Sequence, residues 1–307
     1  MEAKNIMNQL AKALLLAAGG VLAYSLVKKY STPSLPDYYH GKTAIVTGGA
    51  SGIGKAIVEK LVELGAKVLA VDYNKQALAQ LQEEIPTVRV LPMDLVSDDA
   101  PQKILDEACN IFGSVDMLFN NAGIIVLGPF WEMSTSQIER LIAVNLVAQI
   151  RMTHTFLPYF LDRHSGIIAY TGSLSAHVYS PSHSVYTGTK GGLKNFVAAL
   201  RRELPNNSGV QLTIIHPNVT ATNLSDEQLF NMIKNFISLE SSEEVALAFL
   251  IGIARREKEV FVRIRDEAYK WAERLAPEYV DNQFRKLLAV DPTRHLRLAP
   301  VDKTNTD

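Results

Sequence analysis

Short apolar segments alternate with segments of helical periodicity along most of the chain. Apolar residues recur every three or four positions after the first apolar segment, as Ile53, Ile57, Leu61 and Leu64 do, which predicts an amphipathic helix. Runs of β-branched and aliphatic residues predict buried strands. The predicted strands are 43–47, 67–72, 88–94, 116–123, 166–173, 210–217 and 259–264. The predicted helices are 53–64, 74–84, 98–112, 134–162, 184–203 and 241–255.

This alternation predicts an α/β fold with a doubly wound parallel sheet. Strands joined by helices pair in parallel, and right-handed crossovers place helices on both faces of the sheet. Ligands of such sheets bind at the carboxyl ends of the strands. Polar and glycine-rich motifs should therefore gather at that edge.

The two ends of the chain depart from this pattern. Residues 10–27 are almost wholly apolar after Lys12, which predicts a membrane-anchor helix within residues 1–30. A cleaved signal peptide and a helix lying in the membrane interface or on the domain are the alternatives. Residues 31–40 contain two prolines and predict a stiff linker before a catalytic domain at 41–265.

The C-terminal region continues beyond the last predicted strand. Residues 266–290 predict amphipathic helices broken at Pro277, and these could dock on the domain, on another subunit or on a membrane. Residues 291–307 are polar and predict a disordered tail.

Charge and cysteine content narrow the class of function. The 307 residues carry 31 basic and 32 acidic side chains, and this balance argues against a nucleic-acid partner. Cys109 is the sole cysteine, which excludes an intrachain disulfide and favours a reducing compartment. We therefore expect a cytoplasmic catalytic domain, although the lysines flanking residues 10–27 nearly balance and leave the orientation open.

A glycine-rich turn follows the first predicted strand and opens the first predicted helix. Residues 47–54 read Thr-Gly-Gly-Ala-Ser-Gly-Ile-Gly. Glycines let the backbone bend sharply and approach a pyrophosphate, while the helix N-terminus favours negative charge. The residues expected to hold a dinucleotide here are Gly48, Ser51, Gly52, Ile53 and Gly54.

Asp72 ends the second predicted strand and indicates which dinucleotide binds. A carboxylate at this position accepts hydrogen bonds from the ribose hydroxyls of NAD and repels the extra phosphate of NADP. We therefore expect NAD(H) in preference to NADP(H). Lys55 and Lys75 are the nearest cations in the sequence and could weaken that preference.

Two further strand ends complete the expected cofactor site. Asp94 and Leu95 follow the third strand, where a polar side chain could bond the adenine amino group or simply cap a helix. Asn121, Ala122 and Gly123 follow the fourth strand, where small residues let the backbone run beside the cofactor.

Three side chains form the candidate reacting centre. Tyr186 and Lys190 are one helical turn apart, so they share a helix face. A phenol is a poor base at neutral pH, and a neighbouring ammonium together with a positively charged nicotinamide should lower its pKa. Ser173 ends the fifth strand, where its hydroxyl can hold a substrate oxygen.

These motifs, in this order and spacing, resemble the short-chain dehydrogenase/reductase family. The resemblance covers residues 40–265 and implies one Rossmann-type domain, a three-layer α/β/α fold with seven parallel strands, in a homodimer or homotetramer. It implies that Tyr186 is the general acid/base, that Lys190 lowers its pKa and binds the nicotinamide ribose, and that Ser173 polarises the substrate oxygen. It also implies that Asn145 holds a water in a proton relay. Residues Pro217, Val219 and Thr222 would contact the nicotinamide carboxamide.

One position departs from the family pattern near the cofactor. The segment after the sixth strand usually begins Pro-Gly, and here Asn218 replaces the glycine. Asparagine tolerates positive φ better than most residues, so we expect the turn to persist.

The expected activity is interconversion of an alcohol with a ketone or aldehyde. Residues 124–130, 174–183 and 222–239 should line the substrate site, and their apolar character favours a lipophilic substrate. Membrane-anchored hydroxysteroid and retinol dehydrogenases have a similar layout. The alternatives are an NADPH-dependent lipid ketone reductase and a nucleotide-binding membrane protein without turnover.

No metal site is expected from the sequence. Four histidines fall between residues 154 and 183, but their spacing matches no helical ligand pair and no carboxylate motif joins them. We interpret them as loop and surface side chains. The histidines are His154, His164, His177 and His183.

Overall fold

The computed structural model describes residues 33–220 and 239–289 and contains one seven-stranded sheet. All the paired strands are parallel, in the order β3-β2-β1-β4-β5-β6-β7. The strands are β1 (Thr43–Thr47), β2 (Lys67–Asp72), β3 (Arg89–Pro92), β4 (Met117–Asn120), β5 (Gly166–Thr171), β6 (Val210–His216) and β7 (Glu259–Phe261). The doubly wound Rossmann-type fold expected from the sequence is therefore confirmed.

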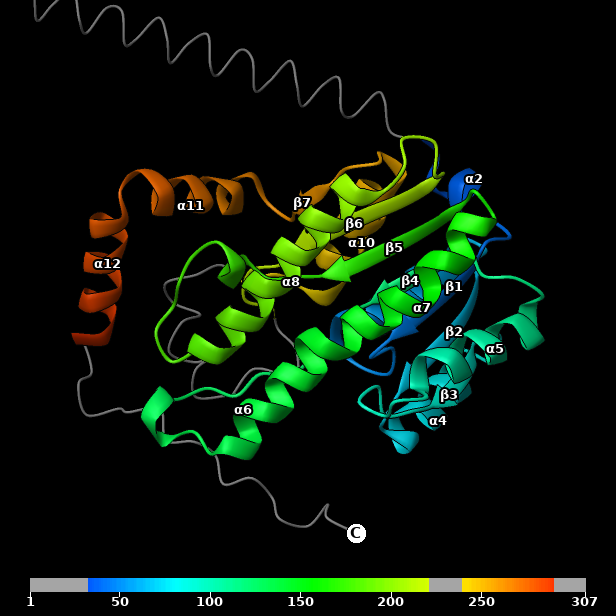
Figure 1. Cartoon of the computed structure of the whole chain (residues 1–307), viewed down its shortest axis with the longest axis horizontal. Helices are drawn as coiled ribbons and strands as arrows, with labels where there is room; N and C mark the ends of the chain where they lie inside the picture. The colour runs from blue at the N-terminus through cyan, green and yellow to red at the C-terminus, as the bar shows by residue number, and fades with distance from the viewer. Residues whose placement is uncertain (1–32, 221–238, 290–307) are drawn as a thin grey trace, which may run out of the picture.

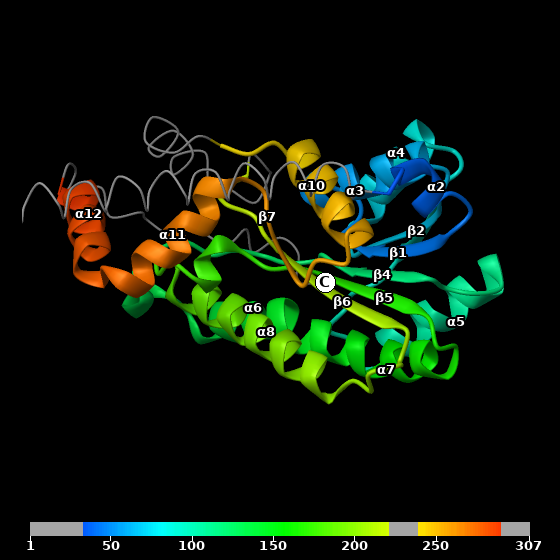
Figure 2. The ribbon, with the colours of Figure 1, turned by 90° about the horizontal axis from the view of Figure 1, so that it is seen from above.

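Helices cover both faces of the sheet and produce three layers (Figures 1 and 2). Each face has its own hydrophobic core, and the central strands are buried throughout. This two-sided burial explains why the strands read as continuous apolar runs. One face packs α2 (Leu35–Tyr39), α3 (Gly52–Glu63), α4 (Lys75–Glu84) and α10 (Ser242–Ala254). The other carries α5 (Ala100–Phe112), α6 (Thr135–Ile142), α7 (Gln149–Asp162) and α8 (Ser184–Glu203).

The chain order reverses between β1 and β4, and this reversal positions the site. These strands are neighbours, with Val46 opposite Phe119, although three helical crossovers separate them in the sequence. The loops that leave their carboxyl ends diverge to opposite faces and open a crevice. The glycine-rich turn after β1 and the Asn121–Gly123 segment after β4 meet there.

The linker expected at residues 31–40 is wrong where the structure describes it. Residues 35–39 form α2, and its proline lies in the first turn, where a missing N–H costs nothing. Tyr39 is fully buried, and its hydroxyl donates a hydrogen bond of 2.8 Å to the carbonyl oxygen of Leu250. Burial of this aromatic side chain fastens the segment to α10.

The long helix expected over residues 134–162 is continuous but irregular. A π-helical segment, η2 (Ala143–Ala148), separates α6 from α7. Such segments widen the helix and often occur at functional sites. Asn145 lies within this one, so the irregularity coincides with a candidate site residue.

The C-terminal extension consists of α11 (Ile264–Leu275) and α12 (Pro277–Ala289), which break at the expected proline. Both extend from the body of the domain on the side of α6 and α8 (Figure 1). Within residues 33–220 and 239–289, no helix has both the length and the hydropathy needed to cross a bilayer. The expected anchor at residues 10–27 and the tail at 291–307 lie outside the described residues.

Candidate active site

A cavity of about 1240 Å³ opens at the carboxyl ends of the strands. Its walls come from the loops after β1, β2, β3, β4, β5 and β6, as the fold predicts. All the candidate cofactor residues that the structure describes line it. They are Gly48, Ser51, Gly52, Ile53, Gly54, Asp72, Asp94, Leu95, Asn121, Ala122, Gly123, Pro217 and Val219.

The glycine-rich turn has the backbone conformation that requires glycine. Gly48 has φ +63° and Gly52 has φ +52°, both in the left-handed region. A Cβ at Gly54 would lie 1.8 Å from the carbonyl oxygen of Gly48, so only glycine lets α3 begin this close to the turn. The Ser51 side chain makes no capping hydrogen bond to α3. The first turn of α3 therefore suits a phosphate group.

Asp72 is buried at the cavity wall and braces the glycine-rich turn. Its carboxylate accepts hydrogen bonds from the backbone N–H groups of Ala50 (3.2 Å) and Asn74 (3.0 Å). Neither of the two lysines that could oppose the charge of Asp72 is placed to do so. Lys55 pairs with Glu84 at 2.5 Å, and Lys75 does not line the cavity.

The residues after β3 and β4 have two different roles: Asp94 faces the cavity, whereas Asn121 holds neighbouring strands together. Asp94 is exposed and pairs with Arg140, a cavity residue that the sequence did not indicate, at 3.2 Å. The Asn121 side chain is fully hydrogen-bonded to its neighbours: its Nδ2 donates to the carbonyl oxygens of Thr47 (3.1 Å) and Gly48 (3.2 Å). Its Oδ1 accepts from the Thr171 hydroxyl at 3.0 Å, so the whole side chain joins β1 to β5.

The candidate catalytic residues meet on one wall of the cavity. Lys190 is buried, and its Nζ donates a hydrogen bond of 2.8 Å to the carbonyl oxygen of Thr171, which anchors α8 to β5. The same Nζ lies 5.7 Å from the centre of the Tyr186 ring. Ser173 follows β5 and lines the cavity together with Tyr186 and Lys190. Its Oγ accepts a hydrogen bond from the N–H of Ser175 at 3.1 Å.

The pKa of Tyr186 differs from the expectation. Burial raises the pKa of this phenol, and a hydrogen bond with Ser173 opposes the rise. Burial also lowers the pKa of Lys190 to about 8. In the protein alone, desolvation penalises both charges and the phenol pKa is not lowered. The expected lowering by Lys190 together with a nicotinamide ring stays a prediction.

Asn145 is buried, and its side chain bonds the backbone of Ile124 and, at 3.4 Å, the hydroxyl of Thr189. Its Oδ1 accepts from the N–H of Ile124 and its Nδ2 donates to the carbonyl oxygen of Ile124, both at 2.8 Å. A Cβ at Gly123 would lie 3.3 Å from Asn145 Oδ1 and 3.5 Å from Lys190 Nζ, so Asn145 lies close to the ammonium. The side chain therefore holds the loop after β4.

The segment after β6 is held by an unforeseen cluster. Asn218 donates from its backbone N–H to Glu240 Oε2 and from its Nδ2 to Asp266 Oδ1, each at 2.9 Å. Among the described residues, the non-glycine positive φ values are at His164, Ser182 and Arg256. The turn after β6 therefore persists because the backbone and side chain of Asn218 donate these hydrogen bonds. The expected reason, a positive φ at Asn218, is wrong. Thr222 lies outside the described residues.

The C-terminal extension contributes to the cavity, which the sequence did not predict. Tyr269 of α11 and Phe284 of α12 line it beside the apolar loop residues. The one signal in the sequence was the amphipathic pattern of residues 266–290, which indicates that one face of these helices packs against something. Of the expected substrate segments, 124–130 and 174–183 supply lining residues, and 222–238 lies outside the described residues.

His177 lies in the loop after β5, as expected, but it is buried and the interpretation of it as a surface side chain is wrong. Its exposed fraction is 7%, because its ring packs against those of His216 and Phe261. His216, at the end of β6, is fully buried and was not considered from the sequence. His154 and His164 are exposed, as expected, and His183 is half-buried at the cavity.

Comparison with known proteins agrees with this geometry. A family model described as short chain dehydrogenase matches residues 42–231. The chain is 37% identical over 193 residues to a 3beta-hydroxysteroid dehydrogenase 2 of Eggerthella lenta, spanning 60% of this chain and 73% of that protein. It is 32% identical over 167 residues to a 2-dehydro-3-deoxy-L-rhamnonate dehydrogenase (NAD(+)) of a Sphingomonas species, spanning 54% and 67%. A short chain dehydrogenase/reductase of Burkholderia phymatum in complex with NAD has a TM-score of 0.71 at 24% identity, covering 80% of this chain and 96% of that one.

Proposed function

The chain belongs to the short chain dehydrogenase family, and from this premise we propose that it transfers hydride between NAD(H) and a lipophilic alcohol or its carbonyl form. One observation carries the proposal. Ser173, Tyr186 and Lys190 line the same cavity as the glycine-rich turn, so a reacting group and a dinucleotide can meet there.

The protein's own part in the reaction is to orient the alcohol and move one proton. In oxidation the hydroxyl proton passes to the Tyr186 oxygen, while the carbinol C–H electron pair leaves with the hydride. Ser173 holds the substrate oxygen, and Lys190 supplies positive charge close to the phenol. A bound dinucleotide supplies the nicotinamide that accepts or donates the hydride.

Several features of the cavity support NAD(H) over NADP(H). Asp72 contributes a buried carboxylate where a ribose would lie, and its backbone hydrogen bonds hold it in place. Arg140 is the nearby cavity cation, and Asp94 already pairs with it. The relative from Sphingomonas carries NAD(+) in its name, and the neighbour from Burkholderia phymatum was solved with NAD.

The cavity lining supports a lipophilic substrate. Beyond the candidate dinucleotide residues, the cavity is walled by aliphatic and aromatic side chains. The apolar residues on the substrate side are Ile124, Ile125, Leu127, Val144, Leu174, Val178, Tyr269 and Phe284. The relative from Eggerthella lenta is named for a hydroxysteroid, which belongs to this chemical class.

The experiment is turnover of NAD+ by the purified full chain with steroids, retinoids and fatty alcohols. We expect oxidation of at least one of them, and a loss of more than about 100-fold in kcat for Tyr186→Phe. NADH binding by that variant should match the wild type. Retained activity in Tyr186→Phe would refute the mechanism, and tight NADH binding without turnover of any alcohol or ketone would favour the non-catalytic alternative.

Membrane attachment and assembly also form part of the proposal. The apolar run at residues 10–27 supports an N-terminal anchor, with the catalytic domain in the cytoplasm as a homodimer or homotetramer. Fractionation of the full chain against a form lacking residues 1–30 tests the anchor. Recovery of both forms in the same fraction would refute it.

A further inference from the structure

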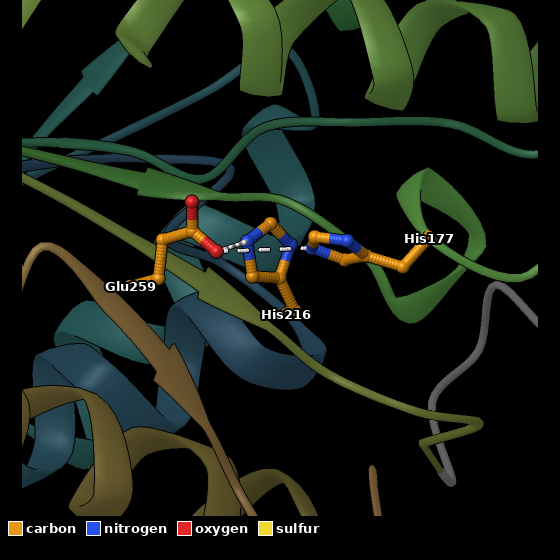
Figure 3. Close-up of side chains that lie close together, drawn as sticks. All are labelled: His177, His216 and Glu259. Atoms are coloured by element: carbon orange, nitrogen blue, oxygen red, sulfur yellow. Dashed lines mark ion pairs between the residues drawn. The ribbon is translucent and has the colours of Figure 1, made fainter. Parts of the chain in front are cut away.

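Three buried ligand atoms meet beside the candidate active site without hydrogen-bond partners. Figure 3 shows His177, His216 and Glu259 converging from three segments of the chain. His216 Nε2 lies 3.6 Å from Glu259 Oε2, and His177 Nε2 lies 3.9 Å from the same oxygen. All three atoms are buried without a hydrogen-bond partner. Such groups are costly unless something satisfies them.

The second nitrogen of His216 defines what its Nε2 can do. Nδ1 lies 3.3 Å from the carbonyl oxygen of Ser173, and a carbonyl can only accept, so Nδ1 carries the proton. In the neutral ring Nε2 then offers a lone pair toward a carboxylate oxygen. Two electron-rich atoms facing each other in a buried site are stabilised when a proton or a metal cation lies between them. A carbonyl that orients a metal-binding histidine in this way is common.

We propose that His177, His216 and Glu259 bind a divalent transition-metal ion such as Zn²⁺. Their candidate ligand atoms all lie within 4.8 Å of one another. Tetrahedral Zn²⁺ with bonds near 2.1 Å places its ligands about 3.4 Å apart, so small side-chain movements close the site. Water or another small ligand completes the coordination. Two imidazoles and one carboxylate are a ligand set typical of zinc.

The protonation states agree with this assignment. Burial lowers the pKa of both imidazoles, to about 3 for His177, which favours the neutral form that metals bind. Phe261 packs against both imidazole rings and supplies an apolar wall.

One cation already approaches the cluster. Lys270 Nζ lies 3.6 Å from Glu259 Oε2, on a partly exposed and flexible side chain of α11. A metal ion would displace this ammonium, and a protein that binds no metal would rely on it instead. Lys270→Gln removes the competitor and should strengthen metal binding.

Binding would join three segments near Ser173. His177 follows the loop that begins with Ser173, His216 ends β6, and Glu259 begins β7. The ion would thus hold the loop that bears a candidate catalytic residue. The expectation of no metal considered His177 only with histidines close to it in the sequence.

The test is titration of the chelator-treated full chain with Zn²⁺, followed by calorimetry and thermal unfolding. We expect one site with Kd at or below about 1 μM and a rise in Tm of about 5 °C. Co²⁺ should give the visible absorption of a tetrahedral site. Glu259→Gln keeps the side-chain shape and should weaken binding by at least about 10-fold. His177→Gln should do the same if Glu259→Gln fails to fold.

His154→Gln is the matched control, because this exposed histidine lies outside the cluster. It should bind Zn²⁺ as the wild type does. Absence of saturable binding, or equal binding by wild type, Glu259→Gln and His177→Gln, would overturn the proposal. None of these measurements depends on turnover, so their outcome is separate from that of the proposed reaction.

Discussion

The side chain of Asn145 pairs with the backbone of Ile124 through two hydrogen bonds of 2.8 Å, as a neighbouring strand would. Asn145 lies in the π-helical segment between α6 and α7, whereas Ile124 lies in the loop after β4. The pairing fixes the loop that lines the substrate side of the cavity. The resemblance implied that Asn145 holds a water molecule. In this structure its side-chain oxygen and nitrogen instead form hydrogen bonds with the loop after β4.

Asn145→Ala should therefore disturb both stability and turnover. Two half-buried backbone groups of Ile124 lose their partners, which should lower the free energy of unfolding by about 1 to 2 kcal/mol. We expect kcat to fall by at least about 10-fold while the Kd for NADH changes little. Urea unfolding and NADH fluorescence measure the two effects. A wild-type kcat in a destabilised variant would show that the loop does not position the reactants.

The ionisation of Tyr186 should depend on the bound nucleotide. Burial raises the phenol pKa in the protein alone, so the phenolate should form only at a pH above the ordinary titration range of tyrosine. NAD+ adds a positive ring to the cavity and should move this titration to lower pH. The ultraviolet difference between wild type and Tyr186→Phe, recorded with and without NAD+, isolates this tyrosine. Identical curves in both conditions would contradict the assignment.

Asp72→Asn should narrow the preference for NADH over NADPH. The amide keeps one acceptor for the backbone N–H groups of Ala50 and Asn74 but removes the negative charge. We expect NADH affinity to fall about 10-fold and NADPH affinity to rise. Asp94→Asn is the control, because Asp94 is exposed and paired with Arg140. An unchanged ratio of affinities in Asp72→Asn would exclude the proposed contact with the ribose.

Glu240 makes stability depend on pH. Burial, with Asp266 beside it, raises its pKa from 4.5 to about 8, so the folded state binds this proton more tightly than the unfolded state. Its stabilising contribution is complete below pH about 4.5 and is lost as pH rises through about 8. Glu240→Gln keeps the neutral shape and should raise Tm at pH 8 by about 2 °C or more.

The control for Glu240→Gln is Glu203→Gln, an exposed position at the end of α8. It should leave the dependence of Tm on pH unchanged. Thermal unfolding across pH 5 to 9 compares the three proteins. Parallel curves for wild type and Glu240→Gln would mean that Glu240 is already ionised in the folded protein.

Phe284 should determine affinity for a bulky substrate. It lines the cavity from α12, so Phe284→Ala removes an apolar contact and should raise KM for a lipophilic alcohol by about 10-fold. NADH affinity should not change. Tyr279→Ala is a matched control on the same helix, because Tyr279 is 63% exposed and does not line the cavity. Equal KM values for the two variants would show that α12 does not contact the substrate.

The local motifs could be predicted because each depends on neighbouring residues. The glycine-rich turn needs positive φ at Gly48 and Gly52, and the Tyr186–Lys190 pair needs only the helical repeat. Parallel strands then bring the loops after β1 and β4 to one edge. This is why the candidate cofactor residues that are described line one cavity.

The contacts that the sequence did not indicate join segments that are distant along the chain. Asn218 meets Asp266 across 48 positions, and Asn145 meets Ile124 across 21. His177 lies close to His216 and Glu259 only because the loop after β5 folds over β6 and β7. No local pattern marks such partners.

By itself, the sequence determined the fold, the glycine-rich turn and the candidate reacting side chains, because periodicity, glycine and short spacings act within one element. Only the tertiary structure decided the pKa values of those side chains and the hydrogen bonds that hold them in place. The pKa of Tyr186 follows from burial, and burial is a property of the assembled layers. The same packing placed α11 and α12 over the cavity and left three ligand atoms facing one another beside Ser173.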